Sequence, residues 1–143
     1  MNRAELQKMA EERLKDAAAL LDGGRWEFAY YATGYSAECG LKSCILARMV
    51  FTAWVFEEKW QASACLTHDL EKLVQLSGLT DQRNADLQAS AAAGREFAAN
   101  WAVAAKWTVT SRYEVKTEAE ARALFAAIAD EPHGVLRWIK TYW

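Results

Sequence analysis

Apolar residues recur every three to five positions along the first part of the chain, which is the spacing of one face of an α-helix. The recurring positions are Leu6, Met9, Leu14, Ala17 and Leu21, and charged residues occupy most of the positions between them. This pattern predicts a helix over Arg3–Leu21. The glycines of the "DGGR" segment that follows favour a tight turn into an antiparallel second helix.

The second predicted helix runs from Arg25 to at least Met49, and a continuation to Glu58 is left open. Its apolar and aromatic residues fall on more than one side, so we expect this helix at the centre of the fold. These residues are Phe28, Tyr31, Ala32, Tyr35, Leu41, Ile45 and Met49. Gly34 and Gly40 lower the helix propensity of the segment, and we expect a neighbouring backbone to pack closely against them.

The next two predicted helices are separated by the "SGL" segment. Thr67 is expected to cap a short helix that runs through Leu76, with Asp69 and Glu71 near the positive end of its dipole. A longer helix is expected over Asp81–Lys106.

The last part of the chain begins with "WTVTSRYEVK", whose β-branched residues predict an extended connection or a short strand. Thr117 followed by Glu120 is a capping box, which predicts the start of a fifth helix that ends near Ala129. "DEPHG" then interrupts the pattern, and "GVLRWIKTYW" predicts a final helix. With no internal repeat, low-complexity segment or linker, the 143 residues are expected to form a single domain, residues 1–143, of the all-α class: an up-and-down bundle of five to six helices.

The composition agrees with an ordinary globular protein, with 52% hydrophobic and 25% charged residues. A net charge of −2 without a basic block gives no case for strong non-specific nucleic-acid binding driven by the field of the whole protein, and a local basic groove is left open. Cys39, Cys44 and Cys65 form no CxxC pair, which favours three reduced thiols in a cytoplasmic protein. The acidic, amphipathic start is unlike a signal peptide, and no apolar run has the length needed to span a membrane.

Tyr31, Tyr35, Glu38 and Lys42 follow one another at intervals of four, three and four residues and therefore share one helix face. Glu38 and Lys42 have the spacing of a structural ion pair, worth roughly a few tenths of a kcal/mol at the edge of a bundle. Alternatively, this face is a binding surface, because a buried charge pair is a weak stabiliser and needs another reason to exist.

Two further segments carry polar groups with functional potential. His68, beside Asp69 at a helix start, is expected to bond the backbone or Asp69, and His133 is expected in a turn; two histidines without an i+4 partner give little support for a metal site. Arg112 and Tyr113 are preceded by tryptophans, and a guanidinium near aromatic rings either engages a phosphate or base or ties a loop to a helix. No phosphate-binding glycine loop or nucleophile motif is present, so no catalytic residue, cofactor or metal is predicted.

The order of several segments resembles the HEPN domain family. The segment "AAALLDGGRWEFAYYATGYSAECGLKSCI" is similar to the opening helix pair of that family, and "THDLEKLVQLSGL" is similar to its short His-x-Leu-x-x-Leu segment. "SRYE" and "AEARALFAAIADEPHGVLRWI" resemble its Arg-Tyr loop and closing helices. The resemblance covers nearly the whole chain.

This resemblance implies an all-α bundle that forms a homodimer and is associated with a minimal nucleotidyltransferase in toxin–antitoxin or phage-defence pairs. Many members are RNases that use an arginine followed four to six residues later by a histidine. Here Arg122 precedes His133 by eleven positions (133 − 122), and Arg48 precedes His68 by twenty (68 − 48). The RNase motif is therefore missing, and the resemblance supports the fold more than the nuclease activity.

The hypothesis that follows is a non-catalytic, HEPN-like domain that binds a nucleotide, a nucleic acid or a nucleotidyltransferase partner. Its expected ligand-binding residues are Tyr35, Glu38, Lys42, His68, Arg112 and Tyr113. One alternative is a divergent ribonuclease in which folding brings His68 and Arg112 together. Another is a structural interaction module in which Glu38 and Lys42 only hold helices in register.

Overall fold

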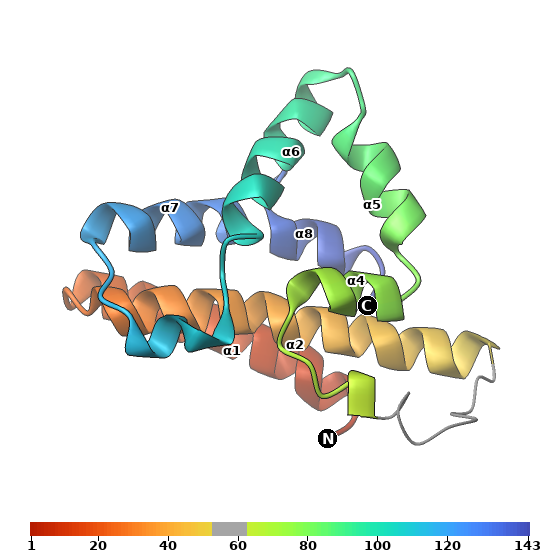
Figure 1. Cartoon of the computed structure of the whole chain (residues 1–143), viewed down its shortest axis with the longest axis horizontal. Helices are drawn as coiled ribbons and strands as arrows, with labels where there is room; N and C mark the ends of the chain where they lie inside the picture. The colour runs from red at the N-terminus through yellow and green to blue at the C-terminus, as the bar shows by residue number, and fades with distance from the viewer. Residues whose placement is uncertain (53–62) are drawn as a thin grey trace.

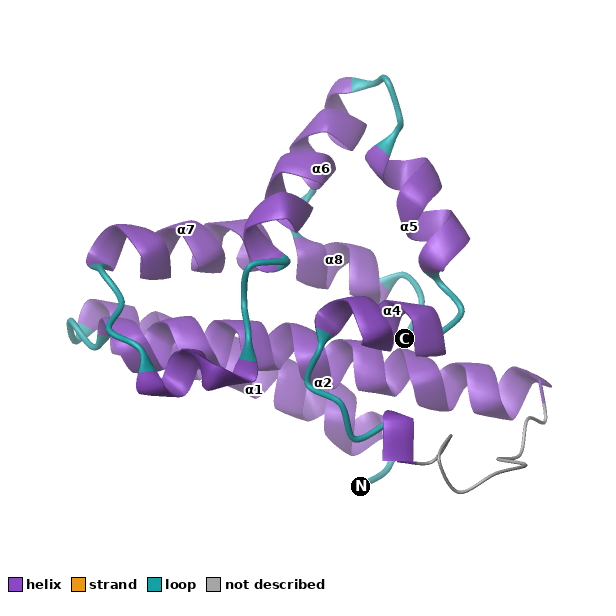
Figure 2. Ribbon diagram, in the orientation of Figure 1, coloured by secondary structure: helices purple, strands orange, loops and turns teal. Residues whose placement is uncertain are grey.

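The computed structural model describes residues 1–52 and 63–143, and the regular structure within these residues is entirely helical (Figure 2). It comprises seven α-helices and one 3₁₀ helix: α1 (Arg3–Asp22), α2 (Trp26–Thr52), α4 (Leu70–Leu76), α5 (Thr80–Leu87), α6 (Ala92–Ala104), η1 (Val109–Tyr113), α7 (Glu118–Ala129) and α8 (Val135–Lys140). The predicted all-α class is confirmed. The proposed continuation of α2 to Glu58 lies outside the described residues.

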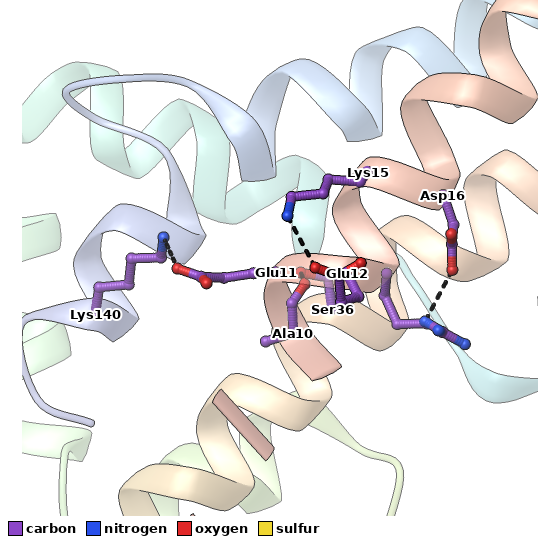
Figure 3. Close-up of polar contacts among 8 residues, drawn as sticks. Ala10, Glu11, Glu12, Lys15, Asp16, Ser36 and Lys140 are labelled. Carbon is purple, nitrogen blue, oxygen red and sulfur yellow. Dashed lines mark hydrogen bonds and ion pairs between the residues drawn. The ribbon is translucent and has the colours of Figure 1, made fainter. Parts of the chain in front are cut away.

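The first two helices form a long antiparallel pair, coloured red to yellow in Figure 1. The Asn2 side chain accepts a hydrogen bond from the Glu5 N–H (2.9 Å) and so caps α1. Gly24 takes a φ of +69° in the turn between the helices, a conformation that few other residues adopt readily. The buried Ser36 hydroxyl donates to the Ala10 carbonyl across the pair (2.7 Å; Figure 3).

Helix α2 is the central element, as its pattern predicts, since α1, α4, η1, α7 and α8 all pack against it. In Figure 1, α7 and α8 lie along the α1–α2 pair, and α5 and α6 rise from it as an inverted V. Lys140 of α8 forms a surface ion pair with Glu11 of α1 (2.8 Å; Figure 3) and so links the last helix to the first. No helix in the described part of the chain is long and apolar enough to cross a membrane.

Three predicted helix limits are wrong. The final helix, predicted over "GVLRWIKTYW", ends at Lys140. The short helix begins at Leu70, not directly after Thr67, because Asp69 provides the cap by accepting from the Lys72 N–H (3.2 Å). The Thr67 hydroxyl instead accepts from the Asp69 N–H (3.1 Å) in the preceding turn.

The helix predicted over Asp81–Lys106 is in fact two helices, α5 and α6, separated by residues 88–91. The break contains neither glycine nor proline, so local composition gives no sign of it. It allows α5 and α6 to fold back on each other, which brings Asp86 to the indole N–H of Trp138 in α8 (2.8 Å).

The segment predicted to be extended or a strand contains the 3₁₀ helix η1 instead. The Thr108 and Thr110 hydroxyls lie 2.8 Å apart, and the Thr108 N–H donates to the Ser111 hydroxyl (3.4 Å), so polar side chains close the turn. This local bonding overrides the β-propensity of the segment. The prediction at Thr117 is confirmed, because Thr117 and Glu120 form the reciprocal capping box of α7.

The two glycines within α2 are both sites of close packing, but against side chains, not a neighbouring backbone. The indole of Trp107 lies directly on Gly34, well inside the distance that a Cβ atom there would need. A Cβ at Gly40 would lie 2.9 Å from the Ile139 Cγ2 atom of α8. Gly34 therefore positions the loop before η1, and Gly40 positions α8.

We expect Gly34→Ala to lower the free energy of unfolding by about 1–3 kcal/mol, although alanine has the higher helix propensity, because the indole of Trp107 must move. Gly23→Ala is the matched control, since a Cβ there meets nothing closer than 3.4 Å and its φ of −87° suits alanine. Urea denaturation of both variants measures the effect. Equal stabilities of the two variants would contradict the role assigned to Gly34.

Candidate functional site

A buried carboxylate joins two elements that are far apart in the sequence. Glu38 of α2 is only 1% exposed. Its Oε1 atom accepts a hydrogen bond from Lys42 Nζ (2.7 Å), and both of its oxygens face His68 Nδ1, at 2.9 and 3.0 Å. Glu38, Lys42 and His68 thus form one cluster, the Glu38 centre, in which the ion pair predicted from spacing gains a histidine.

The Glu38 carboxylate determines which nitrogen of His68 carries the proton. A carboxylate only accepts hydrogen bonds, so Nδ1 must be the donor, and in the neutral ring Nε2 is then an acceptor. The His68 side chain is 48% exposed, whereas that of Lys42 is 23% exposed. The Glu38 centre therefore presents an oriented imidazole, backed by a buried charge, at the surface.

The sequence-based assignment of His68 to the backbone or Asp69 is wrong. Asp69 is occupied with the cap of α4, and the imidazole turns toward α2. Glu38 and His68 are 30 residues apart, so no local pattern could have paired them. His133, by contrast, lies in the turn before α8 as predicted, where its N–H donates to the Asp130 carboxylate (3.2 Å) and its Nε2 lies 3.3 Å from Glu96.

A pocket of about 450 Å³ lies beside the Glu38 centre, between the start of α4 and the loop before η1. It is lined by Thr67, His68, Asp69, Leu70, Glu71, Ala105, Trp107, Thr108 and Val109, and we call it the His68 pocket. Its wall includes the carboxylates of Asp69 and Glu71. It also includes Trp107, whose buried indole N–H has no hydrogen-bond partner within the described residues.

A second pocket, of about 410 Å³, lies where η1 approaches the start of α2. It is lined by Gly24, Arg25, Glu27, Phe28, Arg112, Tyr113, Glu114 and Val115, and we call it the Arg112 pocket. Phe28, Tyr113 and Val115 are 64%, 77% and 87% exposed, so large apolar groups stand in water around it. Such a cluster of exposed apolar side chains is typical of a binding surface.

Arg112 is held by tyrosines instead of by an acid. Its guanidinium carbon lies 4.9 Å from the centre of the Tyr113 ring, and hydrogen bonding and charge interaction with Tyr113, followed by hydrogen bonding with Tyr31, raise the pKa of Arg112. No ion pair with a carboxylate involves Arg112 or Arg25 within residues 1–52 and 63–143. Glu27 and Glu114 line the same pocket, but neither forms an ion pair with Arg112 in the described part of the protein.

Tyr31 and Tyr35 lie between the two pockets along α2. Their rings are stacked, with centres 6.0 Å apart and planes inclined by 8°, and the Tyr31 ring centre is 6.2 Å from that of Trp107. Burial raises the pKa of Tyr35 to about 12, so its hydroxyl is protonated at neutral pH. η1 and α4 both pack on α2 (Figure 1).

The structure places five of the six site residues proposed from the sequence in two groups, and the sixth, Tyr35, stacks on Tyr31 and lines neither pocket. Glu38, Lys42 and His68 form the Glu38 centre, and Arg112 and Tyr113 belong to the Arg112 pocket. His68 and Arg112 line different pockets that have no lining residue in common, so the alternative that brings these two side chains together gains no support. Arg25 and Phe28 also line the Arg112 pocket, and no motif or spacing in the sequence indicated this.

The described residues contain no group of three or more His, Cys, Asp or Glu side chains that could hold a metal ion. Cys39 and Cys44 form no disulfide, and burial raises the pKa of Cys39 to about 11 and that of Cys44 to about 12, so these two thiols are not activated as nucleophiles. Searches with the chain found no matching family model, curated protein or solved structure.

We expect Lys42→Met to lower the free energy of unfolding by about 1–3 kcal/mol, because it removes one of two partners from the buried Glu38 carboxylate. Lys15→Met is the matched control: Lys15 also makes a 2.8 Å ion pair, with Glu12, but both side chains are largely exposed, and we expect no measurable change. Chemical denaturation at neutral pH gives both values. A Lys42→Met protein as stable as the Lys15→Met protein would show that Glu38 does not depend on its ion pair.

Proposed function

We propose that this protein is a non-catalytic, HEPN-like domain that binds a nucleotide or single-stranded nucleic acid at the Arg112 pocket. The observation that carries the proposal is the state of Arg112, a guanidinium oriented by tyrosines, with no carboxylate partner among the described residues, beside exposed aromatic rings. A homodimer and a nucleotidyltransferase partner in a toxin–antitoxin or phage-defence system are further parts of the proposal, and they rest on the resemblance in sequence.

The chemistry of the pocket suits a phosphate next to a base. A guanidinium forms two parallel hydrogen bonds with a phosphate, and Arg25 adds a second positive charge on the same wall. Exposed rings such as Phe28 and Tyr113 offer stacking surfaces for unpaired bases. Because the protein as a whole is slightly acidic, binding depends on this local group and not on a long-range field.

We expect Arg112→Gln to weaken binding of a fluorescein-labelled single-stranded RNA and to reduce the slope of log Kd against log salt by about 0.7, the value for one lost phosphate contact on a single strand. Arg122→Gln is the control, since Arg122 is similarly exposed but already pairs with Glu118 (2.8 Å) and should leave both values unchanged. Fluorescence anisotropy at several salt concentrations measures them.

Two outcomes would contradict the proposal. Equal losses in the Arg112→Gln and Arg122→Gln proteins would remove the special role of Arg112. If no nucleotide or oligonucleotide binds or raises the melting temperature, the remaining interpretation is a structural interaction module.

A divergent ribonuclease is the second candidate, and one observation favours it: the Glu38 carboxylate orients His68 so that Nε2 can accept a proton. We nevertheless expect no cleavage of single-stranded RNA in the presence of EDTA. Among the described residues, no arginine or second histidine lines the His68 pocket to stabilise the transition state or protonate the leaving group. Gel electrophoresis of incubated RNA tests this expectation. Cleavage that His68→Ala abolishes would establish the ribonuclease instead.

A further inference from the structure

We propose that the His68 pocket binds a guanine base of the same nucleic-acid strand whose phosphate contacts Arg112. This inference rests on the proposed function and assigns a base preference to it. It follows from three acceptors around the pocket, the His68 imidazole and the Asp69 and Glu71 carboxylates; the Thr67 and Thr108 hydroxyls of the lining both donate and accept.

His68 is the first acceptor. Because Nδ1 donates to Glu38, the neutral ring offers only the lone pair of Nε2 to a ligand. A phosphate oxygen or a carbonyl cannot donate to it, whereas an N–H group can. The neutral form of His68 thus selects hydrogen-bond donors at this position of the pocket.

The two carboxylates supply further acceptors. Glu71 uses its Oε1 atom to hold Arg83 and the indole N–H of Trp101, and no hydrogen bond occupies its Oε2 atom within the described residues. Asp69 caps α4 with its Oδ1 atom. Its Oδ2 atom lies 4.0 Å from Lys72 Nζ, which is too far for a hydrogen bond. Both side chains are about half exposed, so a ligand can reach them.

The remaining lining supplies apolar surface for a flat ring. Leu70 and Trp107, which are 4% and 3% exposed, and the more exposed Val109 contribute it. The buried Trp107 N–H has no hydrogen-bond partner among the described residues. A planar heterocycle rich in N–H groups matches this combination of apolar walls and acceptors.

Guanine presents more N–H groups on its Watson–Crick edge than the other bases do. Its Watson–Crick edge carries the N1–H and the N2 amino group side by side, which a carboxylate accepts together. Uracil carries a single donor on this edge, N3–H, and would turn the two carbonyl oxygens beside it toward the acidic wall. A carbonyl oxygen that faces a carboxylate oxygen away from water is strongly disfavoured. A well-placed pair of hydrogen bonds is worth about 1–3 kcal/mol of discrimination between bases, or roughly 5- to 150-fold in affinity.

The spacing of the two pockets fits one strand. Phe28 of the Arg112 pocket and Glu38 are ten residues apart on α2 (38 − 28), which is about 15 Å along a helix with a rise of 1.5 Å per residue. Lys106, which is exposed and lies between the lining residues Ala105 and Trp107, adds a positive charge beside the acidic wall for the sugar–phosphate backbone. A short single strand can therefore reach both pockets.

The test compares three RNA hexamers by fluorescence anisotropy: one of uridine only, one with a single guanosine and one with a single inosine, which lacks the N2 amino group. We expect the guanosine hexamer to bind about tenfold more tightly than the uridine hexamer, and the inosine hexamer to lie between them. Glu71→Gln keeps an oxygen for Arg83 but replaces the other oxygen with a donor. It should therefore abolish the preference, so that the guanosine and uridine hexamers bind the variant with equal affinity.

The two histidines of the chain allow an independent measurement by ¹⁵N NMR of the imidazole nitrogens. The Nε2 resonance of His68 should shift when guanosine monophosphate binds, whereas that of His133, which lies 3.3 Å from the exposed Glu96, should not. Glu38→Gln should weaken the response of His68, because the amide does not fix the tautomer as a carboxylate does.

The outcomes separate this inference from the proposed function. If all hexamers bind equally and Arg112→Gln weakens all of them, the base preference is overturned and the proposed function stands. If no hexamer binds, both fail. If arginine amide shifts the His68 resonance and guanosine monophosphate does not, the pocket receives a guanidinium from a protein partner, and the assignment of guanine is overturned.

Discussion

The contact between the Trp107 indole and the bare backbone of Gly34 is the constraint on which both candidate sites depend. The ring is 97% buried against α2, so it fixes the loop that enters η1. On one side of this contact the loop carries Arg112 to the start of α2, and on the other it forms a wall of the His68 pocket. A glycine in the middle of a central helix usually costs stability, and here it provides the space in which a loop becomes part of a rigid surface.

The Glu38 centre shows how a buried charge is accommodated in such a surface. Leaving an isolated carboxylate away from water is costly, and the ammonium of Lys42 and the imidazole of His68 compensate for this cost at hydrogen-bonding distance. Both partners extend to the surface, so the charge is buried while its partners meet solvent. Hydrophobic residues would fill the same space without the cost of burying a charge, so stability alone does not explain the Glu38 centre. The orientation of His68 explains it better.

Local signals predicted the parts of the fold that depend on neighbours in sequence. The first helix, the capping box of Thr117 and Glu120, and the Glu38–Lys42 pair all arise within four residues, and all three are present. The contact of His68 with Glu38 spans 30 residues and depends on how α4 packs on α2, so no spacing rule contains it. The break between α5 and α6 was missed for a related reason, since a tertiary contact, that of Asp86 with Trp138, and not a helix-breaking residue accompanies it.

Glu71 gives the molecule a thermodynamic connection between distant parts. One of its oxygens holds Arg83 of α5 and Trp101 of α6, and the same side chain lines the His68 pocket. Arg83 is itself buried and stacks on Trp101, with 5.0 Å between its guanidinium carbon and the ring centre. A ligand that alters the ion pair between Glu71 and Arg83 must change the free energy with which the α5–α6 hairpin docks. Docking of the hairpin must in turn change the binding free energy of that ligand by the same amount.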